Sequence, residues 1–228
     1  MSTSMLREAL SGVQHVLLDF DGPVCHVFAA LPAPIVTQEL NRLYRERAGA
    51  AFPWHVSRHG DPLEVVRAAG QNGDPHLRTL ADALAAAELR AVEAAELTPG
   101  VLQVIAACQE SGRTVSIVSN NSEEAVRRFL QRHGVADLVT PIIGRSSNAA
   151  LMKPDPFPVR QALQRLGARP EEAVLVGDSS SDVQAAIGAG VRPVGYANKD
   201  GKRARLAHAG ATEVISSMAD LAEALIDG

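Results

Sequence analysis

The sequence predicts an α/β fold, in which helices flank a parallel sheet and a small helical insert follows the first strand. Three short apolar runs rich in Val, Ile and Leu read as buried strands, and helical patterns separate most of the strand candidates. Residues 23–97 hold no convincing strand and show helical patterns instead. An alternation of strand and helix is typical of a parallel sheet covered by helices on its faces.

The three apolar runs are the strongest predicted strands, and each ends in a polar residue. They lie at residues 15–19, 114–119 and 173–178. Weaker strand candidates lie at residues 138–143, 192–196 and 212–215. A helix is predicted from Ser122, a good N-cap with Glu124 in the first turn, to about His133.

The insert carries two clear signals for the start of a helix. Asp61-Pro62 and Asp74-Pro75 each predict an N-cap followed by proline at the first helical position. Apolar residues at helical spacing lie around these signals: Val36, Leu40, Leu43 and Tyr44 before them, and Leu77, Leu80, Leu84 and Ala87 or Glu88 after. We therefore expect an α/β core domain at 1–22 and 98–228, with 23–97 inserted as a helical domain.

The composition is that of an ordinary globular protein. The net charge is only -4, with 46% hydrophobic and 21% charged residues, so nothing indicates a nucleic-acid partner. Two cysteines are too few for a disulfide framework. The start of the chain lacks a secretory signal, and no segment approaches the roughly 18 apolar residues of a membrane helix. We expect a cytoplasmic protein without a membrane partner.

The residues that end the strong strands are the first candidates for a site, because open parallel sheets bind ligands at the carboxyl ends of their strands. The first strand continues as Asp19-Phe20-Asp21-Gly22, which places two carboxylates beside a glycine. Taken alone, this string is more typical of a turn that uses Asp and Gly for their backbone preferences.

The second strand ends at Ser119-Asn120, where a hydroxyl and backbone N–H groups precede a helix, as in many anion sites. A plain turn at Ser119 fits as well. After the third strand, Asp178 and Asp182 are four residues apart and could face one point from the start of a helix, or cap it.

Lys153 lies in a stretch with three prolines, which would hold its side chain in a fixed place. Most single lysines, however, are solvated surface charges. The position of Lys153 alone therefore leaves its role open.

Taken in order, DxDG at 19–22, the strand-ending Ser119, Lys153 before a proline and GDxxxD at 177–182 resemble the four motifs of the haloacid dehalogenase superfamily. The resemblance covers nearly the whole chain, and the insert looks like the cap of the phosphoglycolate phosphatase-like branch. It implies a Rossmann-like core with an inserted α-helical cap domain, and a Mg²⁺-dependent phosphatase acting on a small phosphorylated metabolite. The alternatives are a phosphosugar mutase that uses the same site and a non-catalytic protein that keeps the fold.

The resemblance implies the two chemical roles. Asp19 matches the residue that attacks phosphorus and becomes an aspartyl phosphate. Asp21 matches the acid that protonates the leaving oxygen and then takes a proton from water. The superfamily's dehalogenases lack an acid at the position of Asp21, so its presence favours phosphate chemistry. Pro23 departs from the usual Thr or Val and is expected to alter cap motion.

The resemblance also implies how phosphate and metal are held. Ser119, the Asn120 N–H and Lys153 would bind phosphoryl oxygens, and Lys153 would also act in catalysis by shielding Asp19 from the phosphate and stabilising the developing charge. Mg²⁺ would be bound by the Asp19 carboxylate, the Asp21 carbonyl and Asp178. Asp182 would either ligate the metal or act through a bound water or through Lys153.

Substrate choice is expected to lie in the cap, which should close over the site as lids do. Its loop from Phe52 to Asp61 mixes aromatic, imidazole and guanidinium side chains, and Arg58 and His59 are the specificity candidates. A solvated Arg58 on a merely structural loop is the equal alternative. His26, Arg45 and Arg47 are weaker candidates. Cys25 is expected to be a small apolar filler.

Overall fold

The computed structural model describes residues 3–54 and 60–226 and has one six-stranded sheet at its centre. All strand pairs are parallel, and the order across the sheet is β3-β2-β1-β4-β5-β6. The strands are β1 (His15–Leu18), β2 (Thr114–Val118), β3 (Val139–Ile143), β4 (Ala173–Gly177), β5 (Arg192–Tyr196) and β6 (Glu213–Ile215). All six predicted strands are therefore present.

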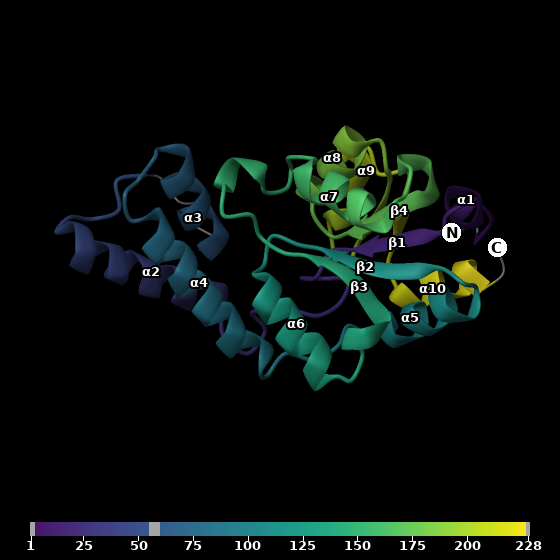
Figure 1. The fold of residues 1–228 in the computed structure, drawn as a ribbon, viewed down its shortest axis with the longest axis horizontal. Coiled ribbons are helices and arrows are strands. Elements are labelled where there is room, and N and C mark those ends of the chain that lie inside the picture. Colours follow the sequence, from purple (N-terminus) through teal and green to yellow (C-terminus); the bar gives the residue numbers. More distant parts are fainter. Residues whose placement is uncertain (1–2, 55–59, 227–228) are drawn as a thin grey trace.

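Helices cover both faces of the sheet (Figure 1). One face carries α1 (Thr3–Leu10), α5 (Val101–Glu110), α6 (Glu123–Arg132) and α10 (Met218–Ile226). The other carries α7 (Phe157–Leu166), α8 (Ser180–Ala189) and α9 (Lys202–Ala209). Short 3₁₀ turns lie at η1 (Ala136–Leu138), η2 (Ala149–Leu151) and η3 (Pro170–Glu172). Across the described ranges, no helix has both the length and the apolar character needed to cross a membrane.

The central strand β1 is apolar because both of its faces are buried. Val16 and Leu18 enter the apolar cluster shared with α5, α6 and α10, whereas Leu17 enters the cluster shared with α7 and α8. Successive side chains of a strand point to opposite faces, so a strand in a two-sided sheet reads as an unbroken apolar run. The predicted three-layer α/β core is confirmed.

Among the described residues, three helices between β1 and α5 form the cap, which stands to one side of the sheet in Figure 1. They are α2 (Ala33–Ala48), α3 (Pro62–Gln71) and α4 (Leu77–Val92). Their apolar faces meet in a cluster of their own that contains Val36, Leu40, Val65, Leu80 and Leu84. The inserted helical cap is thus present, while the domain boundaries at 22/23 and 97/98 stay a prediction.

The two helix-start signals of the cap had different outcomes. Asp61 caps α3 as predicted, since its carboxylate accepts a hydrogen bond from Leu63 N at 2.9 Å and Pro62 is the first helical residue. The expectation that Asp74 caps the next helix is wrong, because α4 begins at Leu77. Asp74 instead accepts hydrogen bonds from His76 N at 2.6 Å and from the Tyr44 hydroxyl at 2.9 Å. It forms a turn that ties α2 to the start of α4.

Candidate active site

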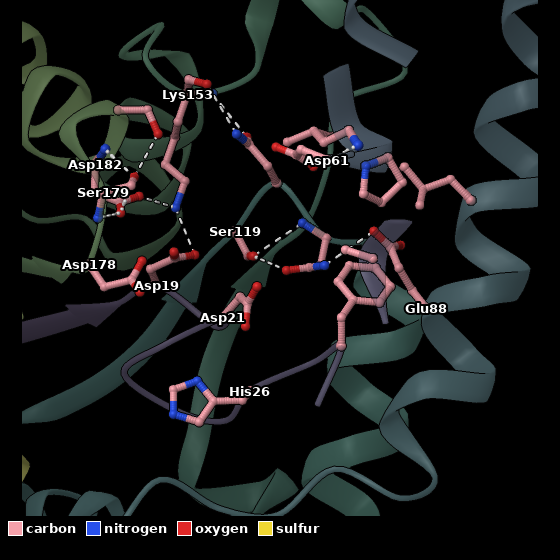
Figure 2. Close-up of a pocket in the computed structure, with 18 of the residues that line it drawn as sticks. Asp19, Asp21, His26, Asp61, Glu88, Ser119, Lys153, Asp178, Ser179 and Asp182 are labelled. Carbon is pink, nitrogen blue, oxygen red and sulfur yellow. Dashed lines mark hydrogen bonds and ion pairs between the residues drawn. The ribbon is translucent and has the colours of Figure 1, made fainter. Parts of the chain in front are cut away.

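The strand order brings the three strand-ending residues together. β2, β1 and β4 are adjacent in the sheet, and Ser119, Asp19 and Asp178 follow directly after them. All three line a cavity of about 630 Å³ between core and cap (Figure 2). The cap side of this cavity is formed by Ala33, Asp61, Pro62, Leu63, Leu84 and Glu88. The carboxyl edge of the sheet therefore carries the candidate site.

Lys153 is buried in the centre of the site. Only 1% of the residue is exposed, and its ammonium lies 2.8 Å from Asp19 Oδ1 and 2.6 Å from Asp182 Oδ1 (Figure 2). It also donates to the carbonyl of Val118 at 2.7 Å. Burying a charge is costly unless it is paired and hydrogen-bonded, so this geometry rules out a solvated surface lysine.

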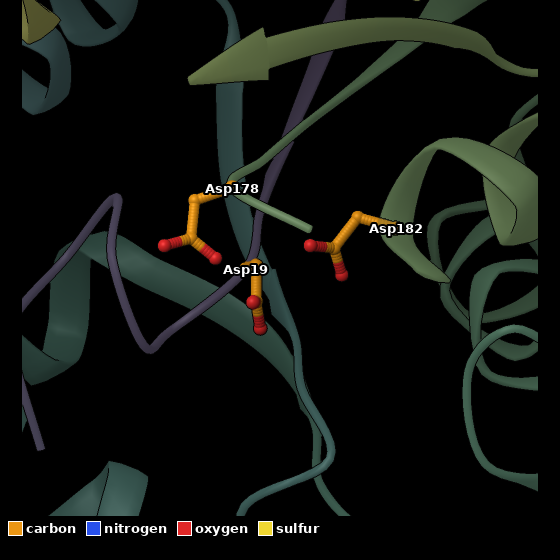
Figure 3. A group of neighbouring side chains, drawn as sticks. All are labelled: Asp19, Asp178 and Asp182. Atoms are coloured by element: carbon orange, nitrogen blue, oxygen red, sulfur yellow. The ribbon is translucent and has the colours of Figure 1, made fainter. Parts of the chain in front are cut away.

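Three carboxylates gather beside this lysine. One oxygen from each of Asp19, Asp178 and Asp182 lies within 4.8 Å of the others (Figure 3). Mg²⁺ binds carboxylate and carbonyl oxygens, so the donor set fits a hard divalent cation. Asp182 is already engaged, because its Oδ2 accepts from Ser179 Oγ at 2.6 Å and its Oδ1 faces Lys153. Both oxygens of Asp182 thus have partners, whereas the contacts of Asp19 and Asp178 fall on one oxygen each, Oδ1 of Asp19 and Oδ2 of Asp178. Asp19 and Asp178 are therefore the better placed carboxylates for a metal.

The Asp178 carboxylate has two further polar neighbours. Its Oδ2 forms an ion pair with Lys202 and accepts a hydrogen bond from Asn198 Nδ2 at 3.2 Å. Lys202 begins α9, just beyond the end of β5. A fourth strand end thus contributes to the charge balance of the acidic cluster.

Two glycines make room for the acidic cluster. A Cβ on Gly22 would lie 2.5 Å from the Asp178 carboxyl carbon, and a Cβ on Gly177 would lie 2.3 Å from Asp182 Cβ. Gly22 also has φ +111, which disfavours other residues. The turn beyond β1 closes through Cys25 N, which donates to Phe20 O at 3.1 Å, and Pro23 lies inside this turn. Its effect on cap motion stays a prediction.

The protonation of the two aspartates after β1 is set by burial. Burial, followed by the neighbouring carboxylate of Asp182, raises the pKa of Asp19, while Lys153 opposes the shift. Burial also raises the pKa of Asp21 to about 6, against the hydrogen bond that Asp21 accepts from Val27 N. The pKa of both carboxyls is thus raised, that of Asp19 to about 7 and that of Asp21 to about 6. They differ in that Asp19 forms an ion pair with Lys153, which favours its ionised form, whereas the contact that Asp21 makes is the hydrogen bond from Val27 N.

Lys153 keeps its charge in this setting. Burial alone would lower the pKa of its ammonium, yet the carboxylates of Asp182 and Asp19 together raise it above its ordinary value. The side chain is therefore cationic at neutral pH and can balance an anion.

The loop after β2 is held in one conformation by polar contacts. Ser119 is buried, and its hydroxyl both donates to Asn121 Oδ1 and accepts from Asn121 N, each at 3.1 Å. The Asn120 side chain pairs reciprocally with the backbone of Lys153, at 2.9 Å and 3.0 Å. Ser122 caps α6 as predicted. The loop and Lys153 are thus locked to each other.

Several weaker candidates can also be placed. His26 lines the cavity, whereas Arg45 and Arg47 are exposed on α2 and do not line it. Arg58 and His59 lie outside the described residues. Cys25 is fully buried, and burial raises the pKa of its thiol well above the ordinary value, as expected for an inert apolar filler.

Sequence reasoning missed four polar residues around the site. Arg67 of α3 donates to the Lys153 carbonyl at 2.7 Å, Arg145 pairs with Glu88, and Lys202 pairs with Asp178. A signal existed for Glu88, because it falls in the apolar stripe of α4, and a buried carboxylate requires partners. Nothing in the local sequence marks the other three.

Known proteins resemble this chain in sequence. The family described as haloacid dehalogenase-like hydrolase matches residues 60–196. A phosphoglycolate phosphatase of Rhodospirillum rubrum is 29% identical over 220 residues, covering 91% of this chain and 89% of the relative. A phosphoglycolate phosphatase of Pseudomonas putida is 32% identical over 188 residues, covering 79% and 68%.

Solved structures share the fold. CbbY from Rhodobacter sphaeroides, in complex with phosphate, aligns with a TM-score of 0.70 at 20% identity, covering 95% of this chain and 100% of CbbY. A hydrolase from Deinococcus radiodurans, with bound phosphate and sodium, aligns with a TM-score of 0.63 at 25% identity, covering 95% and 98%.

Proposed function

This chain belongs to the haloacid dehalogenase-like hydrolase family, and on that premise we propose that it hydrolyses a small-molecule phosphomonoester through an aspartyl phosphate on Asp19, with Mg²⁺ as cofactor. It is an enzyme of the phosphatase kind, similar to the phosphoglycolate phosphatases of R. rubrum and P. putida. The observation that carries the proposal is the buried Lys153 ammonium held between Asp19 and Asp182, beside Asp178.

In the first step, a carboxylate oxygen of Asp19 attacks phosphorus. Two donors fix this carboxylate, since Oδ1 accepts from Phe20 N at 2.7 Å and from Lys153 Nζ. As the bond to Asp19 forms, the bond between phosphorus and the leaving oxygen breaks, and Asp21 gives its proton to that oxygen. The pKa of Asp21, raised to about 6, supports this role because more of it is protonated near neutral pH.

In the second step, Asp21, now ionised, takes a proton from a water molecule. The water oxygen attacks phosphorus and the bond from phosphorus to Asp19 breaks, which releases inorganic phosphate and restores both aspartates. Lys153 and the loop at Ser119 and Asn120 hold the phosphoryl oxygens through both steps.

Charge balance supports the metal. Three carboxylates line the cavity together, those of Asp19, Asp178 and Asp182, and Asp21 becomes a fourth once it has given up its proton. Their charge, only partly balanced by Lys153 and Lys202, would repel a phosphate dianion. Mg²⁺, held by the Asp19 carboxylate, the Asp21 carbonyl and Asp178, would supply the positive charge that the transferring phosphoryl group requires. Asp182 acts on Lys153, with which its Oδ1 forms an ion pair at 2.6 Å.

The substrate class is a small phosphorylated metabolite, because the cavity of about 630 Å³ lies between core and cap. The two relatives that share most of the chain are both phosphoglycolate phosphatases. They favour hydrolysis over the mutase alternative, in which a sugar receives the phosphoryl group. The proposed specificity residues remain Arg58 and His59.

Phosphate release from p-nitrophenyl phosphate and from a panel of phosphorylated metabolites, including phosphoglycolate, tests the function. We expect release that requires Mg²⁺, stops on adding EDTA and is lowered by a factor of about 10³ or more in Asp19→Asn. Equal rates with and without metal, or in wild type and Asp19→Asn, would refute the proposal. Isomerisation of a sugar phosphate without release would identify a mutase.

A further inference from the structure

The cap helix α4 carries a buried carboxylate that the proposed reaction does not use. Glu88 is 1% exposed and lines the same cavity as Asp19 (Figure 2). On α4 it follows Leu84 and Ala87, which belong to the apolar cluster of the cap, and precedes Ala91 and Val92, which belong to that of the core. Glu88 therefore lies where this helix passes from cap to core.

The carboxylate of Glu88 is bonded to the loop that follows β2. Its Oε2 accepts from Ser122 N at 2.9 Å, and its Oε1 accepts from Asn121 Nδ2 at 3.2 Å. Ser119, at the start of this loop, is the proposed phosphate ligand. A residue of the cap thus fixes the far end of the phosphate loop of the core.

Arg145, two residues beyond the end of β3, completes the arrangement. Its Nη1 lies 2.6 Å from Glu88 Oε1 and donates to Asn120 O at 3.1 Å, while its backbone N donates to Asn121 O at 2.7 Å. The side chains of both partners are almost fully buried, at 6% and 2% exposed. The guanidinium therefore neutralises a carboxylate that would otherwise repel a bound phosphate.

We propose that Glu88 and Arg145 are a positioning pair that holds the Asn120–Ser122 backbone in its phosphate-binding conformation, so that docking of the cap helix and affinity for phosphate are coupled. This inference rests on the proposed phosphatase function. Neither residue touches the reacting atoms: the pair acts through the loop. Arg67 of the cap donates a hydrogen bond to the Lys153 carbonyl, which is a second polar contact between the cap and the same site.

Two double variants leave the net charge of the protein unchanged. They distinguish an effect on the position of the loop from an effect of charge and from a loss of stability. Glu88→Met with Arg145→Met replaces the buried ion pair by apolar side chains of similar volume, a change that is often neutral for stability. Glu88→Gln with Arg145→Met has the same charge and similar size but keeps an acceptor for Ser122 N. Glu93→Gln is the matched control, because Glu93 joins α4 to Arg128 at 2.7 Å through half-exposed side chains away from the loop.

Affinity for inorganic phosphate, measured by calorimetry with saturating Mg²⁺ and as a competitive inhibition constant, is the readout. We expect the Met/Met variant to bind phosphate about tenfold more weakly than wild type, with KM raised in step. Its melting temperature should fall by only a few degrees, because Ser122 N and Asn121 Nδ2 lose an acceptor while the buried ion pair is replaced by apolar side chains. The Gln/Met variant should recover most of the affinity, and Glu93→Gln should match wild type. Arg145→Met alone should bind most weakly, because it leaves an unpaired carboxylate beside the phosphate site.

The outcomes distinguish this inference from the function on which it rests. Wild-type affinity in the Met/Met variant, or equal affinities in the Met/Met and Gln/Met variants, overturns the positioning role while leaving the phosphatase intact. A loss of affinity that follows a loss of melting temperature across all variants also overturns it, since this indicates a structural role alone. A wild-type protein that neither binds phosphate nor hydrolyses a phosphomonoester overturns both.

Discussion

At the scale of one residue, Asp21 is an acid of the proposed reaction whose buried position makes the stability of the folded protein depend on pH. Burial raises its pKa from 3.8 to about 6, so the folded protein binds this proton more tightly than the unfolded chain. The stabilisation is fully present below pH 3.8 and is lost as the pH rises through 6. Above that range the folded protein holds a charged, poorly hydrated carboxylate at the site.

Asp21→Asn should therefore stabilise the metal-free protein while abolishing its activity. Asparagine keeps an oxygen that can accept the Val27 N–H and carries no charge. In EDTA at pH 8 we expect the free energy of unfolding to rise by as much as about 3 kcal/mol, with the difference vanishing below pH 4. Urea unfolding curves measure this change in the free energy of unfolding. Asp82→Asn, at an exposed position on α4, is the control. Identical curves at pH 8 would contradict the assigned environment.

The individual site residues differ in how far their sequence predicts them. Asp19 and Asp178 follow from the apolar strands that they end, because adjacent parallel strands bring their carboxyl ends together. The burial of Lys153 could not be read locally: its neighbours Asp19 and Asp182 are distant in sequence and meet it only through the sheet order. The sequence predicts Glu88 only as part of a helical stripe. Periodicity indicates which face of a helix is buried, but not which residues that face contacts.

At the scale of elements, the turn before α4 shows where start signals fail. Asp-Pro predicts a cap at Asp74, yet the Asp74 carboxylate is engaged by the Tyr44 hydroxyl from α2, and the helix begins three residues later. A tertiary hydrogen bond thus decides the helix boundary. At Asp61 the carboxylate accepts from Leu63 N of its own helix, and there the local signal sufficed.

Tyr44→Phe should destabilise the protein by removing the hydrogen bond from α2 to the turn before α4. The variant keeps the ring contacts with Phe52 and Trp54 but leaves the buried Asp74 carboxylate without its hydroxyl donor. We expect a loss of about 1–2 kcal/mol in the free energy of unfolding, measured by urea denaturation. Arg90→Met, which removes an exposed ion pair with Glu39, should change it by less than about 1 kcal/mol. An unchanged stability in Tyr44→Phe would show that the bond contributes nothing.

At the scale of the whole molecule, the site lies where the chain order of the sheet changes direction. From β1 the strands run outward to β2 and β3 on one side and to β4, β5 and β6 on the other. Such a reversal opens a crevice at the carboxyl edge, and the cap covers it. The sequence predicts the parallel sheet and the insert, but the strand order depends on contacts between distant segments that no local pattern encodes.

The central claim is that Asp19 carries the phosphoryl group during turnover. Wild-type enzyme is mixed with Mg²⁺ and a substrate that it hydrolyses, quenched within one turnover and then reduced with borohydride. Because borohydride reduces acyl phosphates, the protein should then contain homoserine at position 19. Peptide mass spectrometry identifies the residue, and Asp19→Asn should yield no such product. Phosphate release without modification of residue 19 at any time in the turnover would contradict the account.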